Sequence, residues 1–392
     1  MKKLKKLTAL VLTVITLFSM FAIMPITVNA ASEYSLSILD DGTAEISDYY
    51  GSAKNLTVPS KISGYKITGI GAYAFKDCSS LVTVTIPNTV KNIGRSAFDS
   101  CDSLVSITIP NSVKGIGENA FRFCYELKEI TIPNSVTSIG KQAFEYCNAL
   151  SKVKISASVT SIGEAAFMFC SNITTIIVDA NNNKYDSRNN CNAIIETKTN
   201  TLLYGSLNTV IPDSVTHIGN NAFYSYRDLK TITIPDSVTS IGDGAFFSCD
   251  NIVELTIPDS VKSIGDMAFQ YCQSLKTITI PESVTSIGDS VFWGCDSMTA
   301  YVYENSYAHK YVINNNIKYE LIKSQPDIII GDVNFDGNVN IIDATDIQKY
   351  SVGLMNFDDK ALASADLNKD GIVNVSDSTL IQKYCAGLVS EF

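Results

Sequence analysis

The chain has 392 residues, a formal net charge of −10 and a hydrophobic fraction of 45%. This apolar content argues against a largely disordered chain, and the acidic balance argues against a nucleic acid or an anionic membrane as partner. Two histidines are too few for most histidine-based zinc sites or triads, and ten cysteines are too sparse in this length for a small disulfide-built fold.

The first thirty residues have the pattern of a secretory signal peptide. Four lysines among the first six residues precede a mainly apolar run over 7–26, and Ala30 is a small residue at the expected cleavage position. The alternative is an uncleaved membrane anchor, since the run is nearly long enough to span a bilayer. Threonine and serine dilute the run, which favours cleavage. No second long apolar stretch follows, so we expect a secreted bacterial protein without a membrane span.

A 23-residue repeat occupies the middle of the chain, and 104–124 is a clean copy of its unit, L-x-x-I-x-I-P-x-S-V-x-x-I-G-x-x-A-F-x-x-C. Ile107 and Ile109 alternate with polar residues, which predicts a short half-buried strand that the following proline ends. Val113 and Ile116 predict an extended return segment, followed by a turn that places the phenylalanine ring inside. Because one unit cannot bury its own apolar face, we expect stacked copies, a solenoid with a parallel sheet on one side.

This repeat resembles the BspA-like leucine-rich repeats of bacterial surface and secreted proteins. The resemblance implies an α/β leucine-rich-repeat solenoid, rich in β-structure, which we expect over residues 31–322. The irregular stretches 34–57 and 298–322 are expected to cap its ends. The family's usual role is protein–protein interaction and adhesion, so the resemblance also implies a binding function without specifying the ligand.

Residues 177–210 interrupt the repeat. The interval from Ile155 to Ile211 is 56 residues, which is not a multiple of 23. A polar, turn-like stretch leads into 193–195 and 202–204, which predict a hairpin around Thr199 and Asn200. Two interpretations are open: a structural excursion between coils, or a binding flap.

Cysteines and aromatic residues recur at fixed positions of the repeat. Eight cysteines each follow a repeat phenylalanine by three residues: Cys78, Cys101, Cys124, Cys147, Cys170, Cys249, Cys272 and Cys295. Metal ligands must converge on a point, whereas these form a column, and parallel side chains rarely meet disulfide geometry. We therefore expect buried free thiols. A second stripe comprises Phe123, Tyr146, Phe169, Tyr224, Phe247 and Trp293, and either packs at a coil corner or stacks on sugars or a protein partner.

Two loops with calcium-ligand spacing lie in the last part of the chain. Oxygen-bearing side chains stand at positions 1, 3, 5, 9 and 12, a glycine at position 6 makes the sharp turn, and position 7 supplies a backbone carbonyl. The first predicted set is Asp332, Asn334, Asp336, Asn338, Asn340 and Asp343. The second is Asp366, Asn368, Asp370, Ile372, Asn374 and Asp377. The sequence therefore predicts an EF-hand-like module that binds two Ca²⁺ ions.

One helix is expected after each loop, over about 344–352 and 378–386, and none of EF-hand length before either. This duplicated loop–helix unit resembles the type I dockerin module over 328–392, behind a linker at 323–327. The resemblance implies calcium-dependent docking to a cohesin module on the scaffoldin of a cellulosome-like complex. It places the cohesin contacts on Ile341, Ile342, Gln348, Lys349, Val375, Ser376, Gln382 and Lys383.

We therefore predict a secreted, non-catalytic interaction protein, anchored by its dockerin and presenting a solenoid to an unknown protein or glycan. One alternative is a carbohydrate-binding or polysaccharide-degrading component of the same complex, and another is a host or cell-surface adhesin. Glycoside hydrolases need two carboxylates across a cleft, and the repeats contain no such marked pair.

Overall fold

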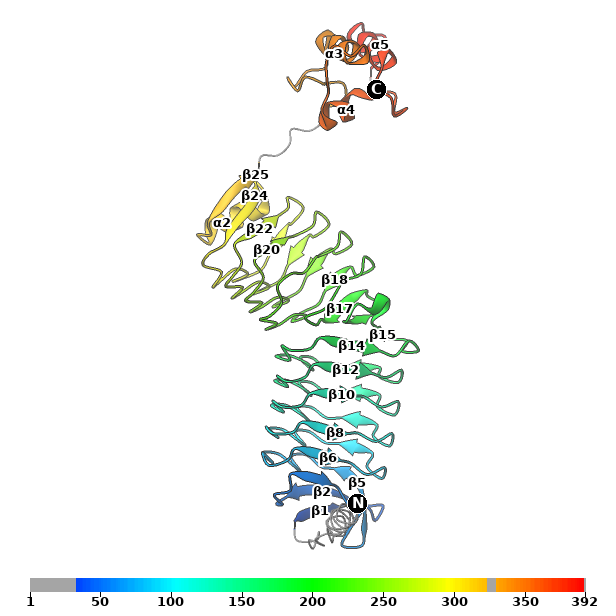
Figure 1. Cartoon of the computed structure of the whole chain (residues 1–392), viewed down its shortest axis with the longest axis vertical. Coiled ribbons are helices and arrows are strands. Elements are labelled where there is room, and N and C mark those ends of the chain that lie inside the picture. The colour runs from blue at the N-terminus through cyan, green and yellow to red at the C-terminus, as the bar shows by residue number, and fades with distance from the viewer. Residues whose placement is uncertain (1–32, 323–328, 391–392) are drawn as a thin grey trace, which may run out of the picture. The chain divides into compact units, whose positions relative to one another are not determined.

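The computed structural model describes residues 33–322 and 329–390. The chain divides after Glu320 into two compact units, which are described separately. The first is a stack of coils and the second a group of short helices (Figure 1). The signal peptide predicted at 1–30 and the linker predicted at 323–327 lie outside the described residues. Among the residues that are described, no helix is long and apolar enough to cross a bilayer.

Most coils of the first unit contribute one strand to each of two sides of the solenoid, and the parallel strands on each side are divided into more than one sheet. The I-x-I strands form one side: β3 (Asn55–Thr57), β6 (Thr83–Thr85), β8 (Ser106–Thr108), β10 (Glu129–Thr131), β12 (Lys152–Ile155), β14 (Thr175–Val178), β20 (Glu254–Thr256), β22 (Thr277–Ile280) and β24 (Thr299–Tyr303). The V-x-x-I segments form the other: β5 (Tyr65–Ile70), β7 (Asn92–Ile93), β9 (Gly115–Ile116), β11 (Ser138–Ile139), β13 (Ser161–Ile162), β18 (His217–Ile218), β19 (Ser240–Ile241), β21 (Ser263–Ile264) and β23 (Ser286–Ile287).

The structure differs from the expectation of a parallel sheet on one side only, because both sides of the solenoid carry paired strands. The return segment was predicted to be extended, but it is also hydrogen-bonded between coils, with Ile116 in register between Ile93 and Ile139. Two-residue strands suffice because each coil repeats the same backbone path, so every pair of neighbours meets in the same register.

The ends of the solenoid depart from the repeat. At the start, β1 (Tyr34–Ile38) and β2 (Ala44–Tyr49) form an antiparallel hairpin, and β2 pairs in parallel with β5. β4 (Lys61–Ile62) pairs with β5. At the other end, α2 (Tyr307–Asn314) is followed by β25 (Tyr319–Ile322), which joins the edge of β24. These elements occupy the terminal coils, where unpaired sheet edges would otherwise face solvent.

The repeat phenylalanines lie inside the coils, as predicted, and their rings also stack along the axis of the solenoid. Phe121 is fully buried and lies nearly parallel to Phe98 and Phe144, at centroid distances of 5.3 and 5.2 Å. The neighbouring turn brings two backbones into contact. A Cβ atom on Gly140 would lie 2.5 Å from the backbone nitrogen of Glu118, so the glycine of the unit is required by the close approach of successive coils.

The cysteine column lies beside these rings. All ten cysteines are free, and seven of the eight repeat cysteines are buried. The thiol of Cys124 donates to the carbonyl oxygen of Phe98 at 3.2 Å, and the thiol of Cys147 donates to that of Phe121 at 3.2 Å. Tyr226 replaces a cysteine and donates its hydroxyl to the Gly205 carbonyl at 2.8 Å. Besides filling space, this column therefore satisfies buried carbonyl groups, a role that hydrophobic packing alone did not predict.

The interruption in the repeat contains β15 (Tyr185–Asp186), the short 3₁₀ turn η2 (Arg188–Asn190), β16 (Ile194–Glu196) and β17 (Thr201–Tyr204). β16 and β17 form the predicted antiparallel hairpin, and β17 then pairs in parallel with β18. The hydroxyl of Tyr204 donates to the Gly163 carbonyl and accepts from the Ala166 amide, both at 3.0 Å. These contacts favour the structural interpretation, because the hairpin joins two stretches of coils.

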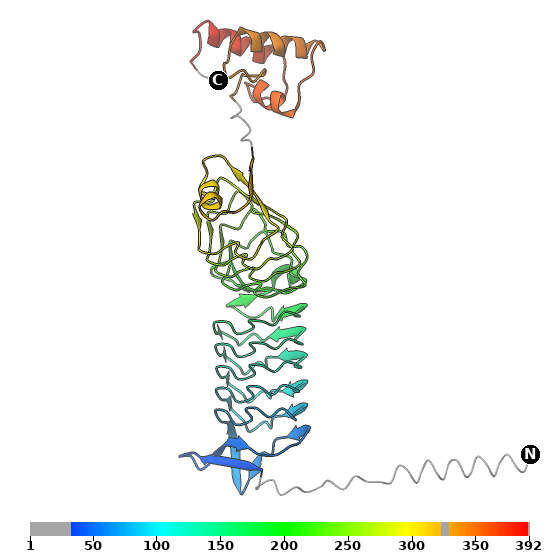
Figure 2. The same cartoon turned by 90° about the vertical axis from the view of Figure 1, so that its left-hand side faces the viewer.

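The second unit contains α3 (Ile341–Ser351), α4 (Asp359–Ala365) and α5 (Val375–Cys385). α3 and α5 begin three residues before the predicted starts at 344 and 378. Each has a capping box, in which Asn340 or Asn374 is the N-cap and the aspartate three residues later returns a bond to the N-cap amide. α4, seven residues long, precedes the second loop and was not predicted. Figure 2 gives a second view of these helices.

Candidate calcium loops and docking face

The first loop turns its oxygen-bearing side chains toward its own backbone amides. The carboxylate of Asp332 accepts from the amides of Asp336 at 3.2 Å and Gly337 at 2.8 Å. Asn334 accepts from Asp336, and Asp336 accepts from Asn338, both at 2.9 Å. Gly337 has a φ of 87°, the left-handed conformation for which glycine is favoured. The sharp turn predicted at position 6 is therefore present.

Asp343, at position 12, closes this loop and starts α3. Its carboxylate is buried and accepts from the amides of Val333 at 3.0 Å and Asn340 at 2.9 Å. Burial raises the pKa of Asp343, its bonds with backbone amides oppose that shift, and the charge of Asp332 raises the pKa further. A buried carboxylate beside a second carboxylate is electrostatically costly without a cation.

The second loop repeats this arrangement. Asp366 accepts from the amides of Asp370 at 3.1 Å and Gly371 at 2.9 Å. Asp377 accepts from Leu367 and Asn374, both at 3.0 Å. Ile372 has no oxygen in its side chain, but its backbone carbonyl accepts from the side-chain Nδ2 of Asn374 at 3.0 Å. Its backbone oxygen therefore lies with the polar groups of the loop, as position 7 requires.

The donor set of both loops fits calcium better than a transition metal. Within residues 33–322 and 329–390, no three His, Cys, Asp or Glu side chains are grouped as metal ligands. Each loop instead mixes three aspartates with asparagine amides and a backbone carbonyl. Hard cations such as Ca²⁺ prefer these oxygen donors, whereas nitrogen and sulfur ligands characterise zinc sites. The residues present therefore fit the predicted ion.

The residues expected to contact cohesin lie on α3 and α5, which pack against each other. Ile341 and Ile342 are each 54% exposed, and Val375 is 57% exposed. Gln348, Ser376 and Lys383 are also exposed, while Gln382 is half-buried. The exposed Lys349 is paired with Asp346 at 2.8 Å.

Two further exposed leucines extend this surface. Leu354 and Leu388 are 79% and 73% exposed and follow Gly353 and Gly387, which end the two helices in the left-handed conformation. The sequence contained a signal for them, because Gly-Leu recurs at both helix ends. Large apolar side chains left this exposed are typical of interaction surfaces.

The aromatic stripe on the solenoid is more continuous than predicted, because Tyr125 and Tyr271 also belong to it. The rings of Tyr146 and Phe169 are 4.1 Å apart and nearly parallel. Stacking on a sugar requires an exposed ring face, whereas these faces cover one another. Trp293, at the end of the stripe, is 58% exposed. The geometry therefore favours packing at the coil corner over a sugar-binding platform.

Comparison with known proteins identifies both units. Residues 50–194 and 202–320 match the BspA type leucine rich repeat region, and residues 330–385 match the dockerin type I domain. Type I dockerins bind calcium and anchor proteins to the cohesins of cellulosome-type complexes. No curated protein was found to match the chain.

Solved structures share the fold of the solenoid. A leucine-rich repeat protein from Eubacterium ventriosum is 26% identical over 70% of this chain and 80% of that one, with a TM-score of 0.53. The pneumococcal vaccine antigen PcpA is 16% identical over 74% of this chain and 96% of that one, with a TM-score of 0.51, and shows the fold alone. The chain belongs to the BspA-type leucine-rich-repeat family and has a C-terminal type I dockerin domain.

Proposed function

We propose that this chain is a secreted, non-catalytic interaction protein that docks to a scaffoldin cohesin and presents its solenoid to a protein or surface. This proposal rests on the duplicated loop–helix arrangement, in which the buried carboxylates of Asp343 and Asp377 accept hydrogen bonds from backbone amides at equivalent positions of the two loops. A signal peptide at 1–30 would direct the chain outside the cell, where cohesins and millimolar calcium are accessible.

Two calcium ions are proposed, one in each loop. Asp332, Asn334, Asp336, Asn340 and Asp343 would supply side-chain oxygens in the first loop, with a backbone oxygen from Asn338. The corresponding residues of the second loop are Asp366, Asn368, Asp370, Asn374 and Asp377, with a backbone oxygen from Ile372. The ion would neutralise the carboxylates, and the protein's own residues would then hold the starts of α3 and α5 in place for docking.

The proposed cohesin surface has two related halves. Ile341, Ile342, Gln348 and Lys349 form one, and Val375, Ser376, Gln382 and Lys383 form the other. Ile342 is apolar where the second half has Ser376, so the halves are expected to differ in affinity. In this assignment the solenoid extends over 31–322 and the docking module over 328–392.

Cohesin capture by the secreted chain tests this proposal. We expect a panel of scaffoldin cohesins to retain the chain in millimolar calcium and to release it in EGTA. Because either half could dock, Asp332→Ala and Asp366→Ala should each leave partial binding, whereas the double variant should abolish it. Asp213→Ala, which changes an acidic residue of the solenoid, is the matched control. Retention that survives both EGTA and the double variant would contradict the proposal.

A further inference from the structure

Both sides of the solenoid are interrupted at the insertion, but pairing resumes sooner on one side than on the other. On one side, a sheet ends at β13 and the next one begins at β15, after which β17, β18, β19, β21 and β23 follow one another without a break. On the other side, the sheet stops at β14 and resumes only at β20. The two intervening coils pass this side at residues 208–211 and 231–234 without forming strands. The sheet on this side is therefore interrupted at two coils, and we call this stretch, residues 208–211 and 231–234, the opening.

Within the part of the chain that is described, the main-chain groups of residues 231–234 form no main-chain hydrogen bond, whereas the amide of Val210 donates to the carbonyl oxygen of Cys191 at 3.2 Å. On the same side of later coils, backbone hydrogen bonds join successive coils. The backbone amide of Lys276 donates to the Val253 carbonyl at 2.7 Å, and the backbone amide of Thr299 donates to the Lys276 carbonyl at 2.8 Å. Even at the smaller break between β8 and β10, the backbone amide of Lys128 donates to the carbonyl oxygen of Val105 at 3.2 Å. Within the described chain, no main-chain bond joins residues 231–234 to either neighbouring coil. An extended segment with free amides and carbonyls is a template for another strand.

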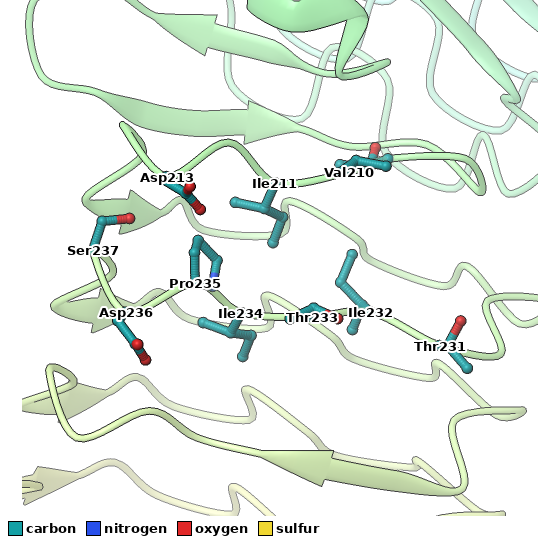
Figure 3. Close-up of a pocket in the computed structure, with 11 residues that line it drawn as sticks. Val210, Ile211, Asp213, Thr231, Ile232, Thr233, Ile234, Pro235, Asp236 and Ser237 are labelled. Carbon is teal, nitrogen blue, oxygen red and sulfur yellow. The ribbon is translucent and has the colours of Figure 1, made fainter.

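Hollows flank this segment on both sides. One of about 760 Å³ lies between 209–211 and 231–234, and one of about 800 Å³ lies between 231–234 and β20. Figure 3 shows the side chains of Ile211 and Ile232 in the space between the two segments. Val210 is 74% exposed beside them. The space has the apolar contacts that alternate side chains of an added strand would need.

The insertion covers the other edge of the opening. The amide of Val178 in β14 donates to the hydroxyl of Ser187 at 3.1 Å, and the amide of Leu207 donates to the Ile173 carbonyl at 2.8 Å. The edge of β14 is therefore protected, whereas 231–234 is not. Acidic side chains mark the open part, since Asp213 and Asp236 line the first hollow and Glu254 the second. No lysine or arginine lines either hollow in the part of the chain that is described.

We propose that this opening is a strand-addition site for an extended, basic peptide segment of a partner protein. The segment would pair with the free backbone groups of 231–234, place apolar side chains on Val210 and Ile232, and direct lysine or arginine to Asp213 and Asp236. A second copy of the chain fits less well, because the whole chain is acidic, with a net charge of −10. This inference deepens the proposed binding role of the solenoid and rests on it, but not on the dockerin.

Hydrogen exchange with a defined probe tests the site on the full secreted chain. The probe is an acetylated seven-residue peptide of alternating valine and lysine, and its control carries proline at the alternate positions, which removes the amides. We expect the alternating peptide to slow exchange at 231–234 at least about tenfold by pairing these amides. The proline peptide should have no effect.

Charge variants distinguish a specific site from general attraction. Asp213→Asn with Asp236→Asn should weaken binding of the alternating peptide about five-fold. Asp259→Asn, at the equivalent position of the next coil, should leave it unchanged. Equal protection by both peptides, no protection by the alternating one, or protection that rises with protein concentration alone would overturn the inference. Cohesin capture, measured in parallel, keeps this result separate from the docking proposal.

Discussion

Replacing Tyr204 by phenylalanine is expected to weaken the joint between the two stretches of coils. The ring would keep its edge contact with Phe167, at a centroid distance of 5.5 Å, so the substitution removes only the hydroxyl. That hydroxyl donates to Gly163 and accepts from Ala166, both at 3.0 Å. The amide of Ala166 also donates to the carbonyl oxygen of Gly163 at 3.3 Å, so neither group is left without a partner. A typical hydrogen bond contributes about 0.5–1.5 kcal/mol, so the two lost bonds predict a loss of about 1–3 kcal/mol in the free energy of unfolding.

Urea denaturation followed by circular dichroism measures this loss, and hydrogen exchange at Ala166 locates it. Exchange at that amide should accelerate, because it loses the Tyr204 hydroxyl and keeps only the longer bond to the Gly163 carbonyl, while amides in the coil of Phe98 should keep their rates. Tyr125→Phe is the matched control, since its hydroxyl has no hydrogen-bond partner among the described residues. If Tyr204→Phe and the control unfold alike and exchange at Ala166 is unchanged, the hairpin does not join the coils as described.

Three further predictions follow from the repeat and the loops. Gly140→Ala should be strongly destabilising, because its Cβ would lie 2.5 Å from the Glu118 backbone. Thermal denaturation checks this, with Gly115→Ala as the control, because there the Cβ would approach only the side-chain oxygen of Ser138, at 3.2 Å. Burial raises the pKa of Cys78 to about 11 and that of Tyr204 to about 12. In the unfolded chain, where their pKa values are about 8.5 and 10, these two groups lose their protons at lower pH than in the folded chain. The free energy of unfolding should therefore fall as the pH rises above those two values, by up to about 1.4 kcal/mol per group and pH unit. A flat stability profile between pH 8 and 11 would contradict this assignment. EGTA should reduce the helical circular dichroism signal of the full chain and calcium should restore it, whereas magnesium at equal concentration should restore less; a signal indifferent to EGTA would refute the calcium assignment.

The repeat carried most of the fold because its information is local. A strand at Ser106–Thr108, a buried ring at Phe121 and a buried thiol at Cys124 all follow from periodicity within one unit. What periodicity could not supply was the pairing between units. The register that makes Gly115–Ile116 a strand, and the carbonyl that Cys124 reaches, exist only once coils are stacked.

In the docking module, too, the spacing of residues predicted one part of the structure and missed another. The spacing of oxygen side chains identified both loops, but the predicted helix starts were wrong by three residues. The signal was present in the asparagine and aspartate three residues apart, such as Asn340 and Asp343, which form a capping box. Because these residues were interpreted as loop positions 9 and 12 only, their second role at the helix start was missed.

The hairpin of the insertion accounts for the contact between the two stretches of coils and for the missing strand at 208–211. β17 replaces a V-x-x-I strand and pairs with β18, so a new sheet on this side begins within the insertion. The residues after β17 form no I-x-I strand, and Gly205 packs against Phe223. A Cβ atom there would lie 2.0 Å from the Phe223 ring, and the Gly205 carbonyl accepts from Tyr226, which stands where other coils have cysteine. The I-x-I strand at 208–211 is therefore missing from the coil of Phe223, where the stacking of the repeat phenylalanines resumes. Substituting Tyr226 by cysteine should therefore leave the Gly205 carbonyl unsatisfied and loosen this joint rather than restore a regular repeat, because the shorter side chain meets a backbone path that the insertion has already displaced.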